Sequence, residues 1–317
     1  GVGCCHAPGR FRRTDDTPDI PRHVLGPGQF NEEAFVALDK VLEEIDANVR
    51  AAMELRPILP DAPYVFPMNS VRLEHADAVG EKMARLGEVR NRLGLPIPDG
   101  FAVSTRACWD FLEEAGVTRR VRSLGEDRGE EAATDGFGDL EALRRRILES
   151  DLPGELSRSI RKAVKRMVEL DPNVRFSVRS SAAWEDGELL AAGQYTTRLN
   201  VRPENVCQAY KEVVASLFTE EVLSYQRGKG VPPGQGLMAV GCQAMVQART
   251  SGVIYSLDPT RPDREVQLVA ASWGLGKTVV EGSAPVDRFA VKRSPERTIL
   301  FRRISEKSRR YVPAPGG

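Results

Sequence analysis

Apolar residues recur at steps of three and four over several stretches of this chain, the spacing of one face of an α-helix. The first stretch follows Asn31, which can cap a helix, and ends before Pro57. The second closes at Gly94, and Thr105 is the expected cap of the third. The predicted helices span residues 31–56, 79–93, 105–115, 140–147, 156–167 and 204–227.

Short apolar runs between turn residues predict β-strands. They span 100–104, 176–178, 237–246, 252–257 and 266–270, and we expect 252–257 to form a hairpin with 237–246. The charged, glycine-containing segment 119–138 is predicted to be a surface loop. The arginine run 144–146 is typical of a solvated helix face.

This mixture of helices and strands predicts an α/β (α+β) fold in three parts. Residues 1–63 would form an N-terminal arm with a helical extension, and residues 64–170 a helix-rich first lobe. Residues 171–317 would form a second lobe of mostly antiparallel strands.

Composition narrows the class of protein. The 317 residues include 45 basic and 45 acidic side chains, so charge gives no reason to expect a nucleic acid or an anionic membrane as partner. No apolar run approaches the roughly 20 residues that cross a bilayer, so we expect a soluble cytoplasmic protein. The five cysteines have no paired spacing, which argues against a disulfide framework and a zinc site. We expect Cys108, Cys207 and Cys242 to act as small apolar residues.

The most informative stretch, residues 176–200, reads F-S-V-R-S-S-A-A-W-E-D-G-E-L-L-A-A-G-Q-Y-T-T-R-L-N. A short strand delivers Arg179 into a turn of two serines, and a small-residue loop around Gly193 follows the acidic pair Glu185 and Asp186. Guanidinium groups bind phosphate oxygens in pairs, and glycine permits close approach. This combination suits a polyphosphate ligand.

The same stretch resembles the ATP-binding domain of the phosphoenolpyruvate synthase, pyruvate phosphate dikinase and rifampin phosphotransferase family. Two further passages carry the resemblance, which covers roughly residues 65–310. They read V-G-E-K-M-A-R-L-G-E-V from Val79 and Q-A-M-V-Q-A-R-T-S-G-V-I-Y-S-L-D-P from Gln243. The resemblance implies a two-lobed fold of the ATP-grasp type with the nucleotide in the cleft between the lobes.

The resemblance also implies roles for particular residues. Lys82 matches the lysine that reaches the ATP phosphates, and Arg179 the arginine that holds the terminal phosphates. Gly193 and Thr197 match positions that line the nucleotide, and Gln243 matches an adenine or ribose contact. Without the resemblance, Lys82 would be interpreted as a solvated helix residue.

The chain departs from the family pattern in several places. Glu81 replaces a usual glycine beside Lys82, which would either weaken nucleotide binding or point outward. Ala270 and Lys277 stand where relatives carry acids, and Ala192 replaces an aromatic residue in a shortened loop. Asp258, which precedes a proline, is either structural or a ligand contact.

Residues 271–278, A-S-W-G-L-G-K-T, satisfy a relaxed P-loop pattern after an apolar strand. A P-loop must open a helix, because the amides of the helix N-terminus hold the phosphates. Gly282 and Pro285 follow too soon for that helix, so we reject the P-loop interpretation.

The resemblance implies ATP and Mg²⁺ as cofactors and phosphoryl transfer to a histidine on a carrier domain, with pyruvate or rifampin as the final acceptor. Neither the carrier domain nor the acceptor domain is recognisable in these 317 residues. We therefore expect a fragment of a larger phosphotransferase that is inactive by itself. A non-catalytic nucleotide-binding regulatory module and an interaction module that docks through its N-terminal helix stay open as alternatives.

Overall fold

The computed structural model describes residues 59–126, 136–182, 195–223 and 237–314. The helix expected at 31–56 lies outside these residues. No helix in the described ranges is long and apolar enough to span a membrane.

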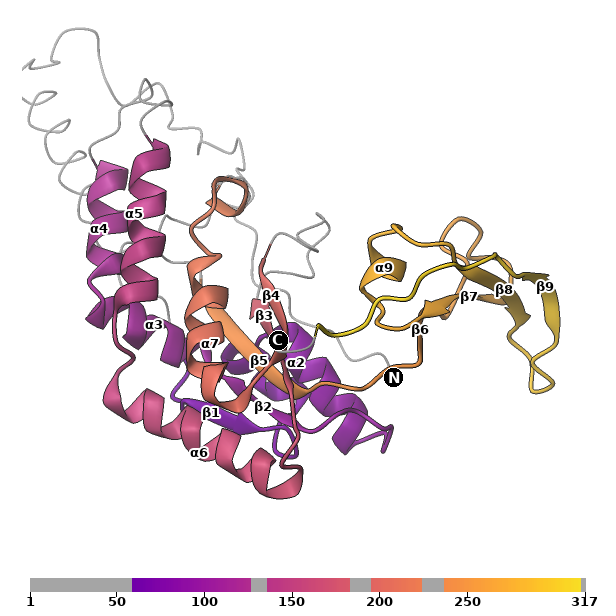
Figure 1. Ribbon diagram of the computed structural model, residues 1–317, viewed down its shortest axis with the longest axis horizontal. Coiled ribbons are helices and arrows are strands. Elements are labelled where there is room, and N and C mark those ends of the chain that lie inside the picture. The colour runs from indigo at the N-terminus through magenta and orange to yellow at the C-terminus, as the bar shows by residue number, and fades with distance from the viewer. Residues whose placement is uncertain (1–58, 127–135, 183–194, 224–236, 315–317) are drawn as a thin grey trace, which may run out of the picture. The chain divides into compact units, whose positions relative to one another are not determined.

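Five antiparallel strands form one sheet, which we call sheet A (Figure 1). In order across the sheet they are β1 (Val65–Pro67), β2 (Gly100–Val103), β5 (Met238–Ala244), β3 (Phe176–Ala182) and β4 (Thr197–Val201). β5 pairs with β2 on one side and with β3 on the other. Residues from both sides of the predicted lobe boundary at 170 therefore share this sheet, and the division into lobes stays a prediction.

One face of sheet A carries the main hydrophobic core. Side chains alternate along a strand, so Phe101, Phe176, Val178 and Cys242 point to the same side, and none is more than 1% exposed. Helical residues complete this core. The helices that supply them are α3 (Thr105–Glu114), α4 (Val117–Glu126), α5 (Gly136–Glu149), α6 (Gly154–Leu170) and α7 (Val206–Ala215).

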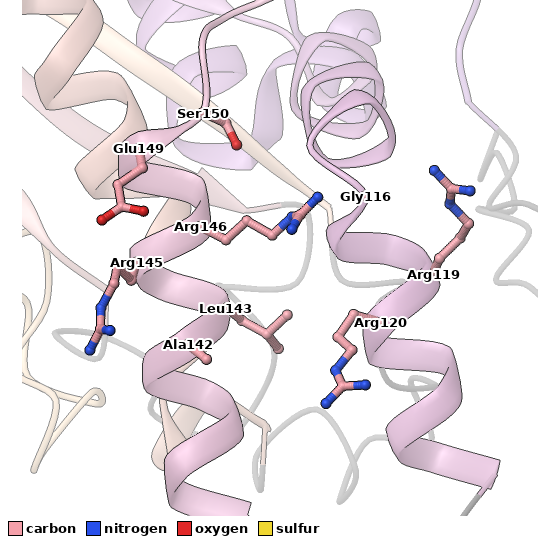
Figure 2. Close-up of a pocket in the computed structure, with 9 residues that line it drawn as sticks. All are labelled: Gly116, Arg119, Arg120, Ala142, Leu143, Arg145, Arg146, Glu149 and Ser150. Carbon is pink, nitrogen blue, oxygen red and sulfur yellow. The ribbon is translucent and has the colours of Figure 1, made fainter.

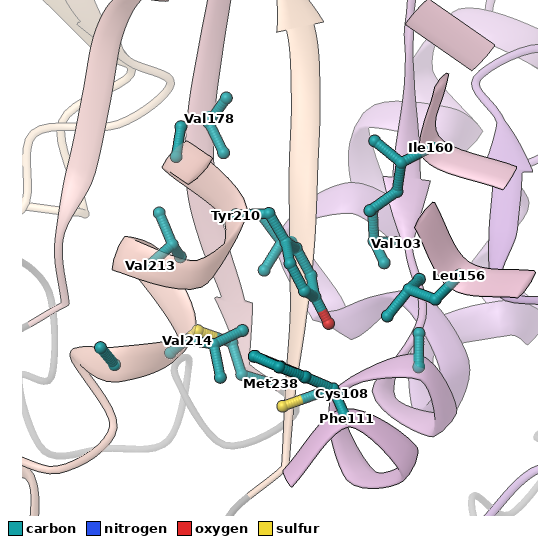
Figure 3. Close-up of a cluster of buried hydrophobic side chains, with 14 of the residues drawn as sticks. Val103, Cys108, Phe111, Leu156, Ile160, Val178, Tyr210, Val213, Val214 and Met238 are labelled. Carbon is teal, nitrogen blue, oxygen red and sulfur yellow. The ribbon is translucent and has the colours of Figure 1, made fainter. Parts of the chain in front are cut away.

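Tyr210 of α7 lies in the middle of this core, with its ring 6.2 Å from that of Phe111 (Figure 3). Burial raises the pKa of Tyr210 well above its ordinary value, so the hydroxyl stays protonated. Burial also raises the pKa of the Cys108 thiol to about 12. Cys108 and Cys242 are buried, as expected, and Cys207 is partly buried. The two buried thiols behave as small apolar side chains.

Helix α2 (Ala76–Asn91) packs on the opposite face of sheet A. Val79 and Met83 of α2 belong to a second, smaller buried cluster with Phe66 and Ala102. Gly241 of β5 makes this close packing possible, because a Cβ at that position would lie 2.4 Å from the Met83 sulfur. The face that bears Arg179 is thus covered in part by a helix that also carries Lys82.

A second antiparallel sheet, sheet B, contains β6 (Thr250–Tyr255), β7 (Val266–Trp273), β8 (Asp287–Lys292) and β9 (Ile299–Arg303), in that order. The helix α9 (Lys277–Val280) has only four residues. Neither of the two buried hydrophobic clusters includes a residue of the described strands of sheet B. Ile254, Ile299 and Phe301 are 68%, 57% and 52% exposed, so this sheet lacks a core of its own.

Most of the predicted elements are confirmed within a few residues at their ends. The helices at 79–93 and 156–167 are α2 and α6, and the strands at 100–104 and 266–270 are β2 and β7. The helix after β2 is capped by Ser104 rather than Thr105, since the Ala107 N–H donates to the Ser104 hydroxyl.

Three predictions are wrong. The strand at 252–257 does not form a hairpin with 237–246, because β6 pairs with β7 in sheet B. Segment 119–138 is not wholly a loop, because α4 continues to Glu126 and α5 begins at Gly136. The helix at 204–227 is not continuous: α7 ends at Ala215, and the Ser216 hydroxyl donates to the Val213 carbonyl at 2.6 Å.

Candidate functional site

Arg179 lies on the face of sheet A opposite the main core. Ser177, Arg179 and Ser181 alternate along β3 with Phe176 and Val178, which point into the core. The Arg179 side chain is partly buried and makes no hydrogen bond or ion pair within the described part of the chain. It is therefore available to bind an anion.

Two other predicted site residues share this face. Arg179 is opposite Thr197 on β4 and Gly241 on β5, and directly paired residues point to the same side of a sheet. Gln243 is opposite Ser177 and is 7% exposed, whereas Thr197 is exposed. The fold therefore places Arg179, Thr197 and Gln243 on one face, with no side chain at Gly241 between them.

The turn that carries Lys82 is anchored to the same strand. Gly80 interrupts α2 with a φ of 74°, and a Cβ there would lie 1.8 Å from the Ser181 carbonyl oxygen. The Met83 N–H donates to the Ser181 hydroxyl at 3.1 Å. Lys82 lies between these two contacts and is partly buried. Since Ser181 is two residues from Arg179 on the same face, the predicted pair of phosphate-binding cations approaches one side of sheet A.

Glu81 does not simply point outward. Its Oε1 accepts a hydrogen bond from Arg85 at 2.9 Å, and the side chain is 28% exposed. Its Oε2 is buried and has no hydrogen-bond partner in the described residues. A negative charge thus lies one residue from Lys82, only partly balanced by Arg85.

The remaining predicted site residue, Gly193, lies outside the described residues, together with Glu185, Asp186 and Ala192. Sequence reasoning missed Ser181 and Gly80, which together fix the Lys82 turn on β3. The available signal was the glycine inside a helical pattern, which often marks a close backbone approach.

Comparison with protein families identifies the chain. The family described as the pyruvate phosphate dikinase AMP/ATP-binding domain matches residues 76–317, from the first residue of α2 onward. This chain belongs to that family.

The curated relatives of the chain include several phosphoenolpyruvate synthases. A probable phosphoenolpyruvate synthase of Staphylothermus marinus is 36% identical over 72% of this chain and 28% of the relative. The phosphoenolpyruvate synthases of Pseudomonas aeruginosa and Escherichia coli are 32% and 33% identical over 78% and 80% of this chain, and over 33% and 34% of their own length. The chain spans about a third of the length of these relatives.

The departures from the family pattern have local structural partners. The Lys277 ammonium lies 3.8 Å from Glu281 and 5.7 Å from the centre of the Tyr311 ring. Ala270 is an internal residue of β7, opposite Val253 and Arg288. Helix α9 begins at Lys277 and is too short to serve as the helix of a P-loop, which agrees with the rejection of that interpretation.

Asp258, the other residue whose role was open, has a structural function. Its Oδ1 accepts hydrogen bonds from the Thr260 N–H at 2.9 Å and the Thr260 hydroxyl at 2.7 Å. These bonds to Thr260 lower the pKa of the Asp258 carboxyl below its ordinary value. The carboxylate therefore stabilises the turn after β6.

Proposed function

We propose that this chain binds Mg²⁺-ATP on the face of sheet A that carries α2. Arg179 supports the proposal most directly: it is partly buried, unpaired among the described residues, and located beside Gly241 on the face to which the Lys82 turn is anchored. Membership in an AMP/ATP-binding domain family agrees with it.

In this proposal Lys82 and Arg179 neutralise the phosphate charge from two directions. Arg179 binds two phosphate oxygens with its planar guanidinium, while Lys82 contributes a compact positive charge. Anchoring of the Lys82 turn to Ser181 fixes part of this arrangement before ATP arrives, which lowers the entropic cost of binding. Gly193, Thr197 and Gln243 line the rest of the nucleotide, as their match to the family pattern implies.

The described residues do not supply a complete protein site for magnesium. No group of three His, Cys, Asp or Glu side chains suited to a metal occurs among them. Protein-bound Mg²⁺ commonly has one or two carboxylate ligands plus phosphate oxygens. The ion would therefore enter with ATP, and we assign it no protein ligand here.

In the longer protein we propose that the bound ATP donates a phosphoryl group to a histidine of a carrier domain in the cytoplasm, with pyruvate as the final acceptor. The relatives named phosphoenolpyruvate synthase favour this over the rifampin branch. Positioning and charge neutralisation by Lys82 and Arg179 are the contributions of this chain. The chain alone is then a binding unit without turnover.

We further propose that the two antiparallel sheets belong to a two-lobed, ATP-grasp-like arrangement, as the resemblance implies. The helix-rich sheet A with α2 would supply the phosphate-binding cations. Sheet B, which has little buried core, would supply the second lobe.

Calorimetric titration with Mg²⁺-ATP tests the proposal. Arg179→Ala is expected to weaken binding tenfold or more, about 1.4 kcal/mol, because it removes a charged phosphate contact. Arg198→Ala is the matched control, since Arg198 is on the neighbouring strand but is opposite Val178 and pairs with Glu212 at 2.6 Å.

Equal weakening by both variants would indicate a general loss of positive charge and contradict a site at Arg179. If the chain does not bind ATP, the same titration is made on the longer protein. No binding there either would overturn the phosphotransferase proposal. Binding without phosphorylation of a histidine in the longer protein would favour the alternative of a regulatory nucleotide-binding module.

A further inference from the structure

A second pocket lies between α4 and α5 and has a volume of about 890 Å³ (Figure 2). Both helices contribute to the core on the other side of sheet A from Arg179. The pocket is therefore separate from the proposed nucleotide site.

The lining of this pocket is strongly basic. Arg119 and Arg120 of α4 and Arg145 and Arg146 of α5 line it, against the single carboxylate of Glu149. The chain as a whole carries equal numbers of acidic and basic residues, so this excess of positive charge is local. Like charges brought together on two neighbouring helices repel one another unless an anion lies among them.

The arginine run that the sequence suggested to be a solvated face is in fact divided among three environments. Arg144 pairs with Glu141 at 3.4 Å on α5 and does not line the pocket. Arg145 lines the pocket from its flank, and Arg146 extends from α5 across to Gly116 (Figure 2).

Arg146 is held in place by the end of α3. Its Nε donates a hydrogen bond to the carbonyl of Ala115, the C-cap residue of α3. The next residue, Gly116, has a φ of 69°, and a Cβ there would lie 3.2 Å from Arg146 Nη2. The guanidinium is thus fixed through one nitrogen, and its two terminal nitrogens make no other hydrogen bond in the described residues. A fixed guanidinium loses little entropy on binding an anion.

We propose that this pocket binds a polyphosphate anion, either free or as the phosphate chain of a nucleotide. Arg146 and Arg120, which point into the gap between the helices (Figure 2), bind its oxygens. Arg119 and Arg145 add long-range attraction from the flanks. Paired guanidinium–phosphate hydrogen bonds are the interaction for which arginine is best suited, and pockets of this volume hold ligands of this size.

Titration with inorganic tripolyphosphate tests the proposal, using calorimetry in a buffer without divalent cations. We expect saturable binding that Arg146→Gln weakens about tenfold and that the double variant Arg119→Gln, Arg145→Gln also weakens. Arg144→Gln is the matched control, because it removes the same charge from the same helix outside the pocket. Since Arg146 also caps α3, thermal unfolding of each variant is measured alongside.

A parallel titration in the Arg179→Ala background separates the two sites. Retained tripolyphosphate binding there supports the pocket, whereas loss of binding places the anion at Arg179 and overturns the proposal. Equal weakening by Arg144→Gln and the pocket variants, or no saturable binding at millimolar concentrations, also overturns it. Titration of the Arg179→Ala variant with ATP distinguishes the two sources: binding as tight as that of tripolyphosphate indicates a nucleotide, and weaker binding a free polyphosphate.

Discussion

At the scale of single residues, Glu81 determines how well the proposed site can hold phosphate. Its Oε2 is buried without a hydrogen bond in the described residues, one position before Lys82, and Arg85 engages only its Oε1. A buried carboxylate near phosphate oxygens repels them, and the repulsion is larger than it would be in water. The glycine typical of the family pattern would leave Lys82 without this opposing charge.

We therefore predict that Glu81→Gln tightens ATP binding several-fold in the absence of Mg²⁺, because it removes a negative charge and keeps the shape of the side chain. The gain should shrink when Mg²⁺ neutralises part of the phosphate charge. Calorimetric titration with and without Mg²⁺ measures both values.

Glu88→Gln provides the control for this prediction. Glu88 lies two turns further along α2 and forms the same kind of ion pair, with Arg92 at 2.9 Å. Its neutralisation should leave ATP affinity unchanged. Equal gains from both variants would show that the overall charge of α2, and not the position of Glu81, controls binding.

Single residues also show the limits of sequence reasoning. Arg179, Thr197 and Gln243 were assigned from their motifs, and alternation along β3 predicts which side of a strand Arg179 occupies. Ser181 was not assigned, because its partner, the Met83 N–H, is 98 residues away in the sequence. Such a contact depends on how a helix packs on a sheet, which local periodicity does not specify.

At the scale of elements, the seating of α2 on β3 depends on one glycine. Gly80 has a φ of 74°, and a Cβ there would meet the Ser181 carbonyl oxygen at 1.8 Å. Gly94, just after the same helix, has a φ of 66° but nothing within 4 Å of a Cβ. The two positions share the backbone strain and differ in space.

We predict that Gly94→Ala costs about 1 kcal/mol of unfolding free energy, the price of a left-handed conformation for an alanine. Gly80→Ala should cost clearly more, because α2 must also move away from β3. The same shift displaces Lys82, so Gly80→Ala should weaken Mg²⁺-ATP binding and Gly94→Ala should not. Chemical denaturation and calorimetry check both effects. Equal costs for the two variants would contradict the close packing at Ser181.

The elements that sequence reasoning missed share a physical cause. α4 was interpreted as part of a loop because charged residues dominate it, although Val117 and Val121, four residues apart, are 0% and 5% exposed. The predicted hairpin of 237–246 with 252–257 failed because β5 is buried between β2 and β3. Nearness in sequence favours a hairpin, but the apolar character of β5 suits a central strand, and that long-range pairing prevails.

At the scale of the whole molecule, the two sheets differ in how they are stabilised. β5 of sheet A has neighbours on both sides, and five helices contribute to the core on one face. Sheet B exposes Ile254, Ile299 and Phe301, and no residue of its strands is in a buried cluster of the described structure. A sheet needs an apolar layer on at least one face for independent stability.

We therefore predict that the backbone amides of β7 and β8 exchange with solvent about a hundredfold or more faster than those of β5, because sheet B can open without disturbing the core of sheet A. Hydrogen exchange followed by mass spectrometry measures both sheets in one experiment. The relatives are about three times as long as this chain, and in the corresponding longer protein the amides of β7 and β8 should slow while those of β5 do not change. Equal protection of the two sheets in the chain alone would show that sheet B is stable without a covering layer. If the longer protein left β7 and β8 unprotected, its additional residues would not be what covers the exposed apolar side chains of this sheet.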